Sequence, residues 1–333
     1  MPAKRFRRFK IPGSALKLSI ITINLNNGAG LRETLRSVVS QGDFTNCEHI
    51  VVDGASTDST PEVIAEFRSH IAKLVAEPDS GVYNAMNKGI ALAEGDYLLF
   101  LNSGDVLVPG VLGKVDFGSF HEDIIYGDLD FQDPGRTRHK DFPPPQDITP
   151  AFFLFNTLPH PATFIRRTLF DQYGPYDETM KIAADSKFFF TVVKSGGATL
   201  RKLPLTISIF KTDGISSNPK FAALCREECR SYLRPVFGGE VFRREDLLIE
   251  RSRKLNECSR ALNERNTAIA KYRTLVRDGT FAAAMADGDL AEDILRMGDL
   301  MLAVRKNGIG KRIIRALSKA LASREKKALE KAH

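Results

Sequence analysis

The sequence predicts an α/β fold with a mostly parallel central sheet, followed by a helical C-terminal region. Between residues 18 and 101, short apolar runs rich in β-branched residues alternate with segments of helical spacing. This alternation is typical of a parallel sheet covered by helices on both faces. Beyond about residue 216 the chain is charged and helical in pattern. We therefore expect a basic N-terminal tail (1–15), an α/β domain (16–216) and an α-helical extension (217–333).

Each element of the α/β domain is expected from a local pattern. Apolar runs that end in polar residues indicate buried strands, and apolar residues three or four positions apart indicate helices. The Thr60-Pro61-Glu62 segment is a helix start, because proline is favoured in the first turn. The expected strands are Leu18–Leu25, Glu48–Asp53, Lys73–Ala76 and Tyr97–Leu101, and the expected helices lie at 31–39, from Thr60 onward and at Tyr83–Ala93.

The pattern changes after residue 120. Ile124–Asp128 and Leu129–Gln132 are expected as two strands, with Asp133-Pro134-Gly135 turning the chain. In the extension, an approximate heptad from Leu248 to Val276 indicates a weak coiled coil. An apolar stripe from Ile309 to Leu321, flanked by basic residues, predicts an amphipathic helix. Such a helix packs on neighbouring helices, forms a homo-oligomer or lies on an anionic membrane surface.

The distribution of charge narrows the class of protein. The net charge is +7, but residues 1–10 contribute +5 and residues 306–333 contribute +7, which leaves −5 for residues 11–305. An acidic body argues against a nucleic-acid binder, although the basic tails could contact anionic lipid. No stretch has the ~20 apolar residues that a membrane span requires, and the basic N-terminus lacks the apolar segment of a signal peptide. These features predict a cytoplasmic protein, with the inner face of the cell membrane as a peripheral contact.

Four polar loops follow the predicted strands. In an open parallel sheet, ligands bind beyond the carboxyl ends of the strands, so these loops are expected to line one rim. Carboxylates and glycines suit a nucleotide, lysine near a helix start suits phosphate, and an aspartate after a strand suits a hard cation. The same residue types are typical of turns and helix caps, and only the gathering of four loops favours a binding site. The loops contain Thr22 to Asn26, Asp53 to Asp58, Glu77 to Gly81 with Asn84, Asn87 and Lys88 beyond, and Asn102 to Asp105.

Several common catalytic motifs do not occur in the sequence. There is no GxxxxGK[ST] or GxGxxG, so phosphate-loop and dinucleotide chemistry lack support, and neither HExxH nor GxSxG is found. The segments that do stand out are SIITINLNN, EHIVVDGASTDST, EPDSGVYNAMNKGIALAEGDYLLFLNSGD, HPATFIRR and YGPYDETMKIAADSKFF. In these motifs and their order, the sequence resembles the inverting family 2 glycosyltransferases, which have the GT-A fold, and among them the bacterial branch that builds surface polysaccharides. The resemblance covers residues 18–216 and implies a nucleotide-diphosphate-sugar donor and a divalent cation, Mn²⁺ or Mg²⁺.

The resemblance also implies roles for particular residues. Asp185 matches the catalytic base, although it could also simply cap the helix that follows. Asp105 matches the metal-binding acid of the DXD-like motif, which here has Gly104 where many members have a second aspartate. The resemblance places Thr22, Asn24, Asp53, Gly54, Asp79, Asn84, Asn87, Lys88 and Ser103 at the donor, and His160, Tyr176 and Asp177 on the acceptor side.

The function that these residues imply is an inverting, metal-dependent glycosyltransferase in polysaccharide or glycolipid biosynthesis, acting on a saccharide or lipid-linked saccharide. The sequence has no QxxRW element, so transfer of one sugar per encounter is expected rather than processive synthesis. Two alternatives stay open. Gly104 favours a catalytically weak domain that serves as a scaffold through its helical tail. A nucleotidyltransferase would also use a nucleotide and a metal, but no Gly-rich basic loop is present to hold a triphosphate.

Overall fold

The computed structural model describes residues 18–42, 46–133, 135–212, 214, 218–243 and 254. By internal contacts the chain divides into two units, Met1–Gly239 and Glu240–His333, and the features below belong to the first. This unit extends past residue 216 and includes one helix of the predicted extension. The N-terminal tail, the heptad positions and the basic C-terminal stripe lie outside the described residues. No helix among the described residues combines the length and the apolar character needed to cross a bilayer.

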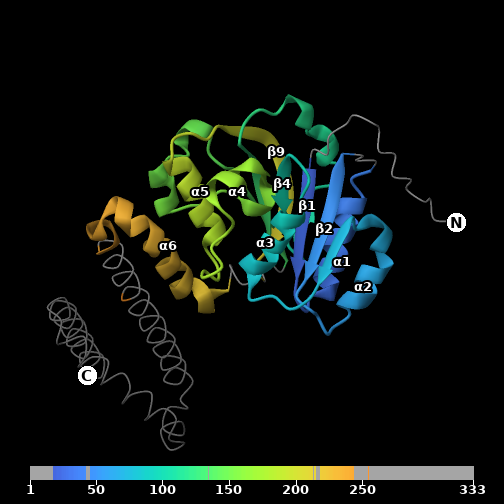
Figure 1. Cartoon of the computed structure of the whole chain (residues 1–333). Coiled ribbons are helices and arrows are strands. Elements are labelled where there is room, and N and C mark those ends of the chain that lie inside the picture. The colour runs from blue at the N-terminus through green and yellow to red at the C-terminus, as the bar shows by residue number, and fades with distance from the viewer. Residues whose placement is uncertain are drawn as a thin grey trace, which may run out of the picture. The chain divides into compact units, whose positions relative to one another are not determined.

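A nine-stranded mixed sheet forms the centre of the first unit (Figure 1). Four parallel strands lie side by side in the order β3-β2-β1-β4, and the other strands continue the sheet in the order β8-β6-β9-β5, with β7 paired to β6. The predicted α/β fold with its mostly parallel N-terminal half is thereby confirmed. The strands are β1 (Leu18–Asn24), β2 (Cys47–Asp53), β3 (Lys73–Ala76), β4 (Tyr97–Phe100), β5 (Val106–Leu107), β6 (Ile124–Asp133), β7 (Arg136–Lys140), β8 (Thr163–Arg166) and β9 (Leu200–Lys211).

Helices cover both faces of the parallel half of the sheet. Helices α1 (Gly28–Val39) and α2 (Thr60–Glu66) pack on one face, where Leu31 and Val63 share a buried cluster with Val51 of β2. Helix α3 (Val82–Leu92) packs on the other face, where a Cβ atom at Gly89 would lie 2.4 Å from the Ile21 side chain. Because side chains alternate along a strand, Ile21 and Val51 point to opposite faces. Glycine therefore lets α3 approach β1 closely.

Three further helices follow in the second half of this unit. Helix α4 (Thr168–Tyr173) and helix α5 (Ala184–Lys194) pack together through the stacked rings of Phe170 and Phe188. Helix α6 (Ala222–Phe237) lies beside α5 (Figure 1), with Tyr232 against Phe190. Short 3₁₀ turns connect the elements: η1 (Arg68–His70), η2 (Leu112–Lys114), η3 (Phe117–Ser119), η4 (Pro145–Asp147), η5 (Pro150–Leu154), η6 (His160–Ala162) and η8 (Pro219–Phe221).

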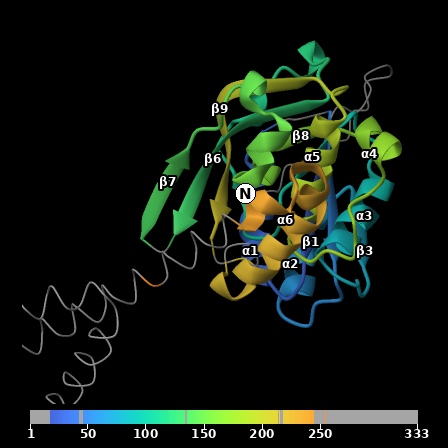
Figure 2. The same ribbon diagram turned by 90° about the vertical axis from the view of Figure 1, so that its left-hand side faces the viewer.

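The segment from 124 to 140 differs from the prediction. The two expected strands are one continuous strand, β6, whose register with β9 shifts next to Gly127. A Cβ atom at Gly127 would lie 2.4 Å from the Leu205 carbonyl oxygen, so the irregular pairing requires glycine. The turn leads into β7, which the sequence did not predict, because its residues Arg136–Lys140 are charged or polar and all exposed. Figure 2 shows β6 and β7 as a hairpin beside β9.

Candidate functional site

The first part of the site lies where β1 and β2 end. Asn24 and Asp53 are paired across the two strands, and both are about 3% exposed. Asn24 Nδ2 donates to Asp53 Oδ1 at 2.9 Å. Asp53 also accepts from the Ser56 backbone N–H at 2.9 Å and from the Ser56 hydroxyl at 2.6 Å. These bonds hold the Asp53 carboxylate in one orientation at the edge of the sheet.

One acceptor in this network lacks a partner. Among the described residues, no donor reaches the buried Asn24 Oδ1. An unsatisfied buried acceptor costs about 1–3 kcal/mol. A ligand that offers an N–H or O–H group would remove that cost. The rim therefore fits a ligand with a hydrogen-bond donor, as nucleobases and ribose have.

A third loop closes on the same rim. The Asp79 carboxylate lies against Gly54, where a Cβ atom would be only 2.5 Å from Asp79 Oδ2. Asp79 Oδ1 accepts from the Gly81 N–H at 3.0 Å. A Cβ atom at position 54 would displace this carboxylate, and the structure places Asn24, Asp53, Gly54 and Asp79 at one rim. Thr22 lies deeper: it is fully buried, and its hydroxyl donates to the Leu101 carbonyl oxygen at 2.7 Å.

The fourth loop is fastened to the middle of α1 and to its N-cap residue, Asn27. Thr34 Oγ1 donates to the Asp105 carbonyl oxygen at 2.7 Å and accepts from the Gly104 N–H at 2.9 Å. Asn27 Nδ2 reaches the Ser103 carbonyl and hydroxyl oxygens at 3.2 and 3.4 Å. Gly104 has φ +106°, a conformation that L-residues rarely adopt. The missing second carboxylate of the DXD-like motif therefore coincides with a backbone position that suits glycine.

The residues of this loop fit a hard cation in part. Asp105 is 6% exposed, and its Oδ1 lies 3.3 Å from the Lys211 N–H on β9. In the same turn Asn102 Oδ1 is buried without a donor among the described residues. Carboxylate and amide oxygens are the ligands that Mg²⁺ and Mn²⁺ prefer. A cation held by Asp105 with Asn102 would satisfy that oxygen.

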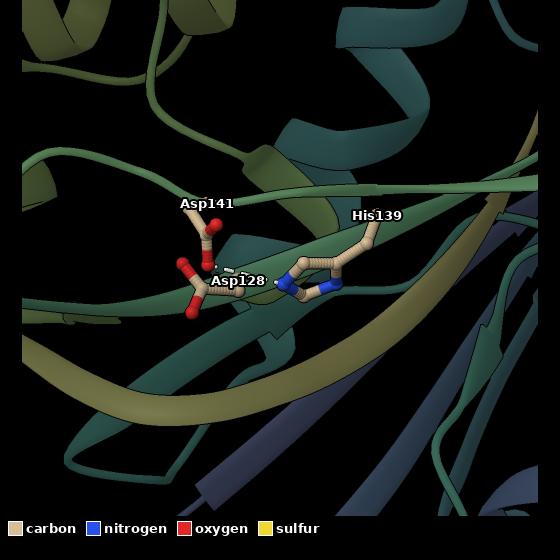
Figure 3. Close-up of side chains that lie close together, drawn as sticks. All are labelled: Asp128, His139 and Asp141. Carbon is tan, nitrogen blue, oxygen red and sulfur yellow. Dashed lines mark hydrogen bonds and ion pairs between the residues drawn. The ribbon is translucent and has the colours of Figure 1, made fainter.

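A separate acidic group with a histidine lies on the β6–β7 hairpin. Asp128, His139 and Asp141 place possible ligand atoms within 4.8 Å of one another (Figure 3). However, Lys202 Nζ lies 3.0 Å from Asp128 Oδ1, and His139 Nδ1 lies 2.7 Å from Asp130 Oδ1. Hydrogen bonds to Asp130 and then Asp141 raise the pKa of His139. The ammonium of Lys202 and the raised pKa of His139 favour ion pairs with these carboxylates, so internal contacts that fasten the hairpin explain the group without a metal.

The predicted base, Asp185, lies in the first turn of α5 and is partly buried. Its Oδ1 accepts a hydrogen bond from the Tyr83 hydroxyl of α3 at 2.9 Å. Its Oδ2 lies 3.9 Å from His160 Nδ1, beyond hydrogen-bond distance. Burial and then the Asp185 charge raise the pKa of Tyr83 well above its usual value. Tyr83 therefore stays protonated at neutral pH and donates to the carboxylate.

His160 and Tyr176 form an aromatic wall beside this carboxylate. His160 stacks on Phe100 with ring centres 4.7 Å apart, and its Nε2 lies 2.9 Å from the Tyr176 hydroxyl. Burial lowers the pKa of His160, although the Asp185 charge acts in the opposite direction. His160 is therefore neutral near pH 7. The predicted acceptor-side residues His160 and Tyr176 thus lie beside Asp185. The third, Asp177, forms an ion pair with Lys187 at 2.5 Å, and this contact lowers the pKa of Asp177 to about 2.

The polar residues of α3 are engaged within the protein. Asn84 and Asn87 donate from Nδ2 to the two Glu178 carboxylate oxygens at 2.9 and 2.8 Å. Lys88 Nζ lies 2.9 Å from Glu77 Oε1 and 2.8 Å from the Pro78 carbonyl oxygen. These contacts fasten α3 to the loops on either side of it. A donor role for Asn84, Asn87 or Lys88 stays a prediction.

Sequence reasoning missed two contributors to the site. Tyr83 binds Asp185, and Glu228 of α6 accepts from the backbone just before α5. The motif GVYNAMNKG contains Tyr83, but an aromatic residue in an amphipathic helix predicts only burial. Glu228 lies 43 residues after Asp185 in a charged helix, where one carboxylate cannot be distinguished from its neighbours.

Comparisons with known proteins show the family and the fold of the chain. Residues 19–155 match the family model described as Glycosyl transferase family 2. An uncharacterized glycosyltransferase of Mycobacterium tuberculosis is 34% identical over 227 residues, 63% of this chain and 81% of that protein. A PGL/p-HBAD biosynthesis glycosyltransferase of Mycobacterium bovis BCG is 33% identical over 214 residues, 62% and 80% of the two chains. The crystal structure of S. aureus TarS 1-349 in complex with UDP superposes with a TM-score of 0.50 at 22% identity, over 59% of this chain and 60% of that one.

Proposed function

The chain belongs to glycosyl transferase family 2, and from this premise we propose that it transfers a sugar from a nucleotide-diphosphate-sugar donor to a hydroxyl group of a saccharide or lipid-linked saccharide, with inversion. The observation that carries the proposal is the placement of Asp185. Its Oδ1 accepts a hydrogen bond from Tyr83 in the first turn of α3. The loop just before α3 carries Asp79, which forms the rim with Asp53 and Gly54. Helix α3 thus contacts both the carboxylate proposed as the base and the loop that contributes Asp79 to the proposed nucleotide rim.

In the proposed reaction, Asp185 takes the proton of the acceptor hydroxyl. The acceptor oxygen forms a bond to the anomeric carbon as the bond from that carbon to the diphosphate breaks, and the nucleoside diphosphate leaves. One in-line displacement inverts the configuration. General-base assistance of this kind contributes roughly 10²–10⁴ in rate. Tyr83 holds the carboxylate oriented, and the neutral ring of His160 bounds the acceptor side.

Donor recognition is proposed for the rim. The buried Asn24 Oδ1 would accept from the base or ribose, and Asp53 lies beside it. Asp105 and Asn102 would hold the divalent cation. When bound, a divalent cation supplies positive charge against the departing diphosphate.

The experiment that tests this function is a thermal-shift panel of UDP, GDP, dTDP and their sugar conjugates, each with and without Mn²⁺ or Mg²⁺. A ligand at 100 times its dissociation constant stabilises the folded state by about 2.7 kcal/mol. We expect one nucleoside diphosphate to shift the melting temperature in a metal-dependent way. The matching nucleotide sugar should be hydrolysed slowly by wild type and at a residual rate roughly 10²–10⁴ lower by Asp185→Asn, which should keep the shift.

Two outcomes would overturn the proposal in different directions. No shift with any nucleotide, on protein shown to be folded, would favour the scaffold. Release of pyrophosphate from a nucleoside triphosphate would favour a nucleotidyltransferase.

We also propose the setting in which this activity operates. The similarity to a PGL/p-HBAD biosynthesis glycosyltransferase supports a role in glycolipid or polysaccharide assembly. The basic residues of 306–333 would bring the enzyme to the anionic inner face of the cell membrane, where a lipid-linked acceptor is presented. Cosedimentation with vesicles of anionic and of neutral lipid measures this contact.

A further inference from the structure

Helix α6 contacts the segment that leads into Asp185 through a single carboxylate. Glu228 accepts hydrogen bonds from three consecutive backbone N–H groups. The Lys181 N–H reaches Oε1 at 2.7 Å, and the Ile182 and Ala183 N–H groups both reach Oε2 at 2.9 Å. Convergent backbone N–H groups form a binding site for an anion. Hydrogen bonds to a charged acceptor are about twice as strong as those between neutral groups.

This contact lies just before the first turn of α5. The N-cap residue of α5 is Ala183, and it has no side-chain cap. Alanine is among the poorest residues at this position, because it offers no oxygen to the N–H groups of the first turn. Glu228 of α6 instead satisfies the N–H groups that precede the helix. The segment that enters α5 is therefore bound by a side chain from α6.

The same helix also contacts the residue that follows Asp185. The Tyr232 hydroxyl donates to Ser186 Oγ at 2.9 Å. Glu228 and Tyr232 are one helical turn apart on α6, so both face α5. Glu228 thus binds the backbone before Asp185, Tyr232 binds the side chain of the residue after it, and Tyr83 binds the Asp185 carboxylate.

We propose that Glu228 is a positioning residue for Asp185: by binding the N–H groups of residues 181–183, helix α6 sets the place of the base relative to the donor and the acceptor. This inference rests on the proposed role of Asp185. It extends the catalytic unit past residue 216, where the α/β domain was predicted to end, into helix α6. Glu228 binds no substrate and acts only through the backbone that carries Asp185.

The test compares Glu228→Gln with Glu227→Gln in the full-length chain. Both changes remove one negative charge from α6, but Glu227 is exposed. With the nucleotide sugar found in the panel above, we expect Glu228→Gln to lower kcat for hydrolysis by at least about tenfold, with KM within about twofold. Glu227→Gln should behave as wild type. A proportional loss of kcat and folded fraction, or an unchanged kcat, would overturn the inference.

A double substitution separates this inference from the proposed function. If Glu228 acts through Asp185, then Glu228→Gln should cause no further loss in an Asp185→Asn background, because residues that act as a unit are not additive. A further loss of the same size would assign Glu228 a role independent of Asp185. Full turnover in Asp185→Asn alone would instead refute the proposed base.

Hydrogen exchange supplies a readout that needs no donor. The backbone amides of residues 181–183 should exchange slowly in wild type and in Glu227→Gln. They should exchange at least about tenfold faster in Glu228→Gln, because an amide that loses its acceptor loses protection. Fast exchange of these amides in wild type, or equal exchange in both variants, would show that Glu228 does not hold this segment.

Discussion

The hydrogen bond between Tyr83 and Asp185 can be removed by a single substitution, Tyr83→Phe. The ring of Tyr83 is 4% exposed, so phenylalanine keeps its packing, and the change deletes the 2.9 Å bond to Asp185 Oδ1. A hydrogen bond to a charged group contributes about 1.5–3 kcal/mol. If the bond orients the carboxylate in the transition state, kcat should fall by about 10- to 100-fold, since ~1.4 kcal/mol corresponds to a factor of ten.

The assay is release of nucleoside diphosphate from the nucleotide sugar at saturating donor, with donor affinity measured in parallel. The affinity for the donor should not change, because the Tyr83 hydroxyl contacts Asp185, the proposed catalytic base, and not the proposed nucleotide rim. The matched control is Tyr173→Phe, which deletes a 2.7 Å hydrogen bond to Ser195 Oγ on a more exposed part of α4 and α5. Equal turnover in the Tyr83→Phe variant and wild type, with both proteins folded, would refute the view that this bond orients the base.

Three further predictions concern stability and metal binding. Ala55 has φ +61°, a conformation that strains an L-residue. Ala55→Gly should therefore raise the free energy of unfolding in urea by about 0.5–1 kcal/mol, because relief of ~1–2 kcal/mol of strain exceeds the cost of the added chain entropy. A lower free energy of unfolding in the variant would contradict the strain. Burial lowers the pKa of His49 to about 4, and its Nδ1 has no partner among the described residues. The unfolded chain therefore binds the proton first, and the free energy of unfolding should fall by about 3 kcal/mol between pH 6.5 and 4, a fall that His49→Gln should lack. Asp105→Asn should abolish the effect of Mn²⁺ on the nucleotide-induced thermal shift, and an unchanged metal response would exclude Asp105 as a ligand.

The parallel half of the fold could be predicted because its signals are local. The strand Lys73–Ala76 has the predicted bounds, and the predicted strand Leu18–Leu25 ends one residue earlier, at Asn24. Hydrophobic runs between polar loops report burial directly, and their alternation with helices implies parallel pairing. The hairpin strand β7 was missed for the opposite reason. Its residues are all exposed, and its place is decided by pairing with β6 rather than by its own sequence.

The meeting of the loops at the proposed donor rim could be predicted from the same local rule, whereas the surroundings of Asp185, the proposed catalytic base, could not. Asn24 and Asp53 meet because parallel strands in register end together. Asp185 was identified from its motif alone. Its partner Tyr83 lies 102 residues away, and Glu228 binds backbone 45 to 47 residues before it. Such contacts depend on helix packing, which no short-range pattern reports.

Helix α3 connects the two halves of the site physically. The loop before it places Asp79 against Gly54 at the proposed donor rim. Its first turn presents Tyr83 to Asp185, and its next turn binds Glu178 through Asn87. Gly89 lets the same helix lie close to β1. Because packed helices shift as units, a movement of α3 would change the donor rim and the base together. The hydrogen bonds from the polar residues of α3 to the neighbouring loops would therefore fix the distance and orientation between the bound donor and the proposed catalytic base. A direct displacement at one carbon requires such fixed geometry.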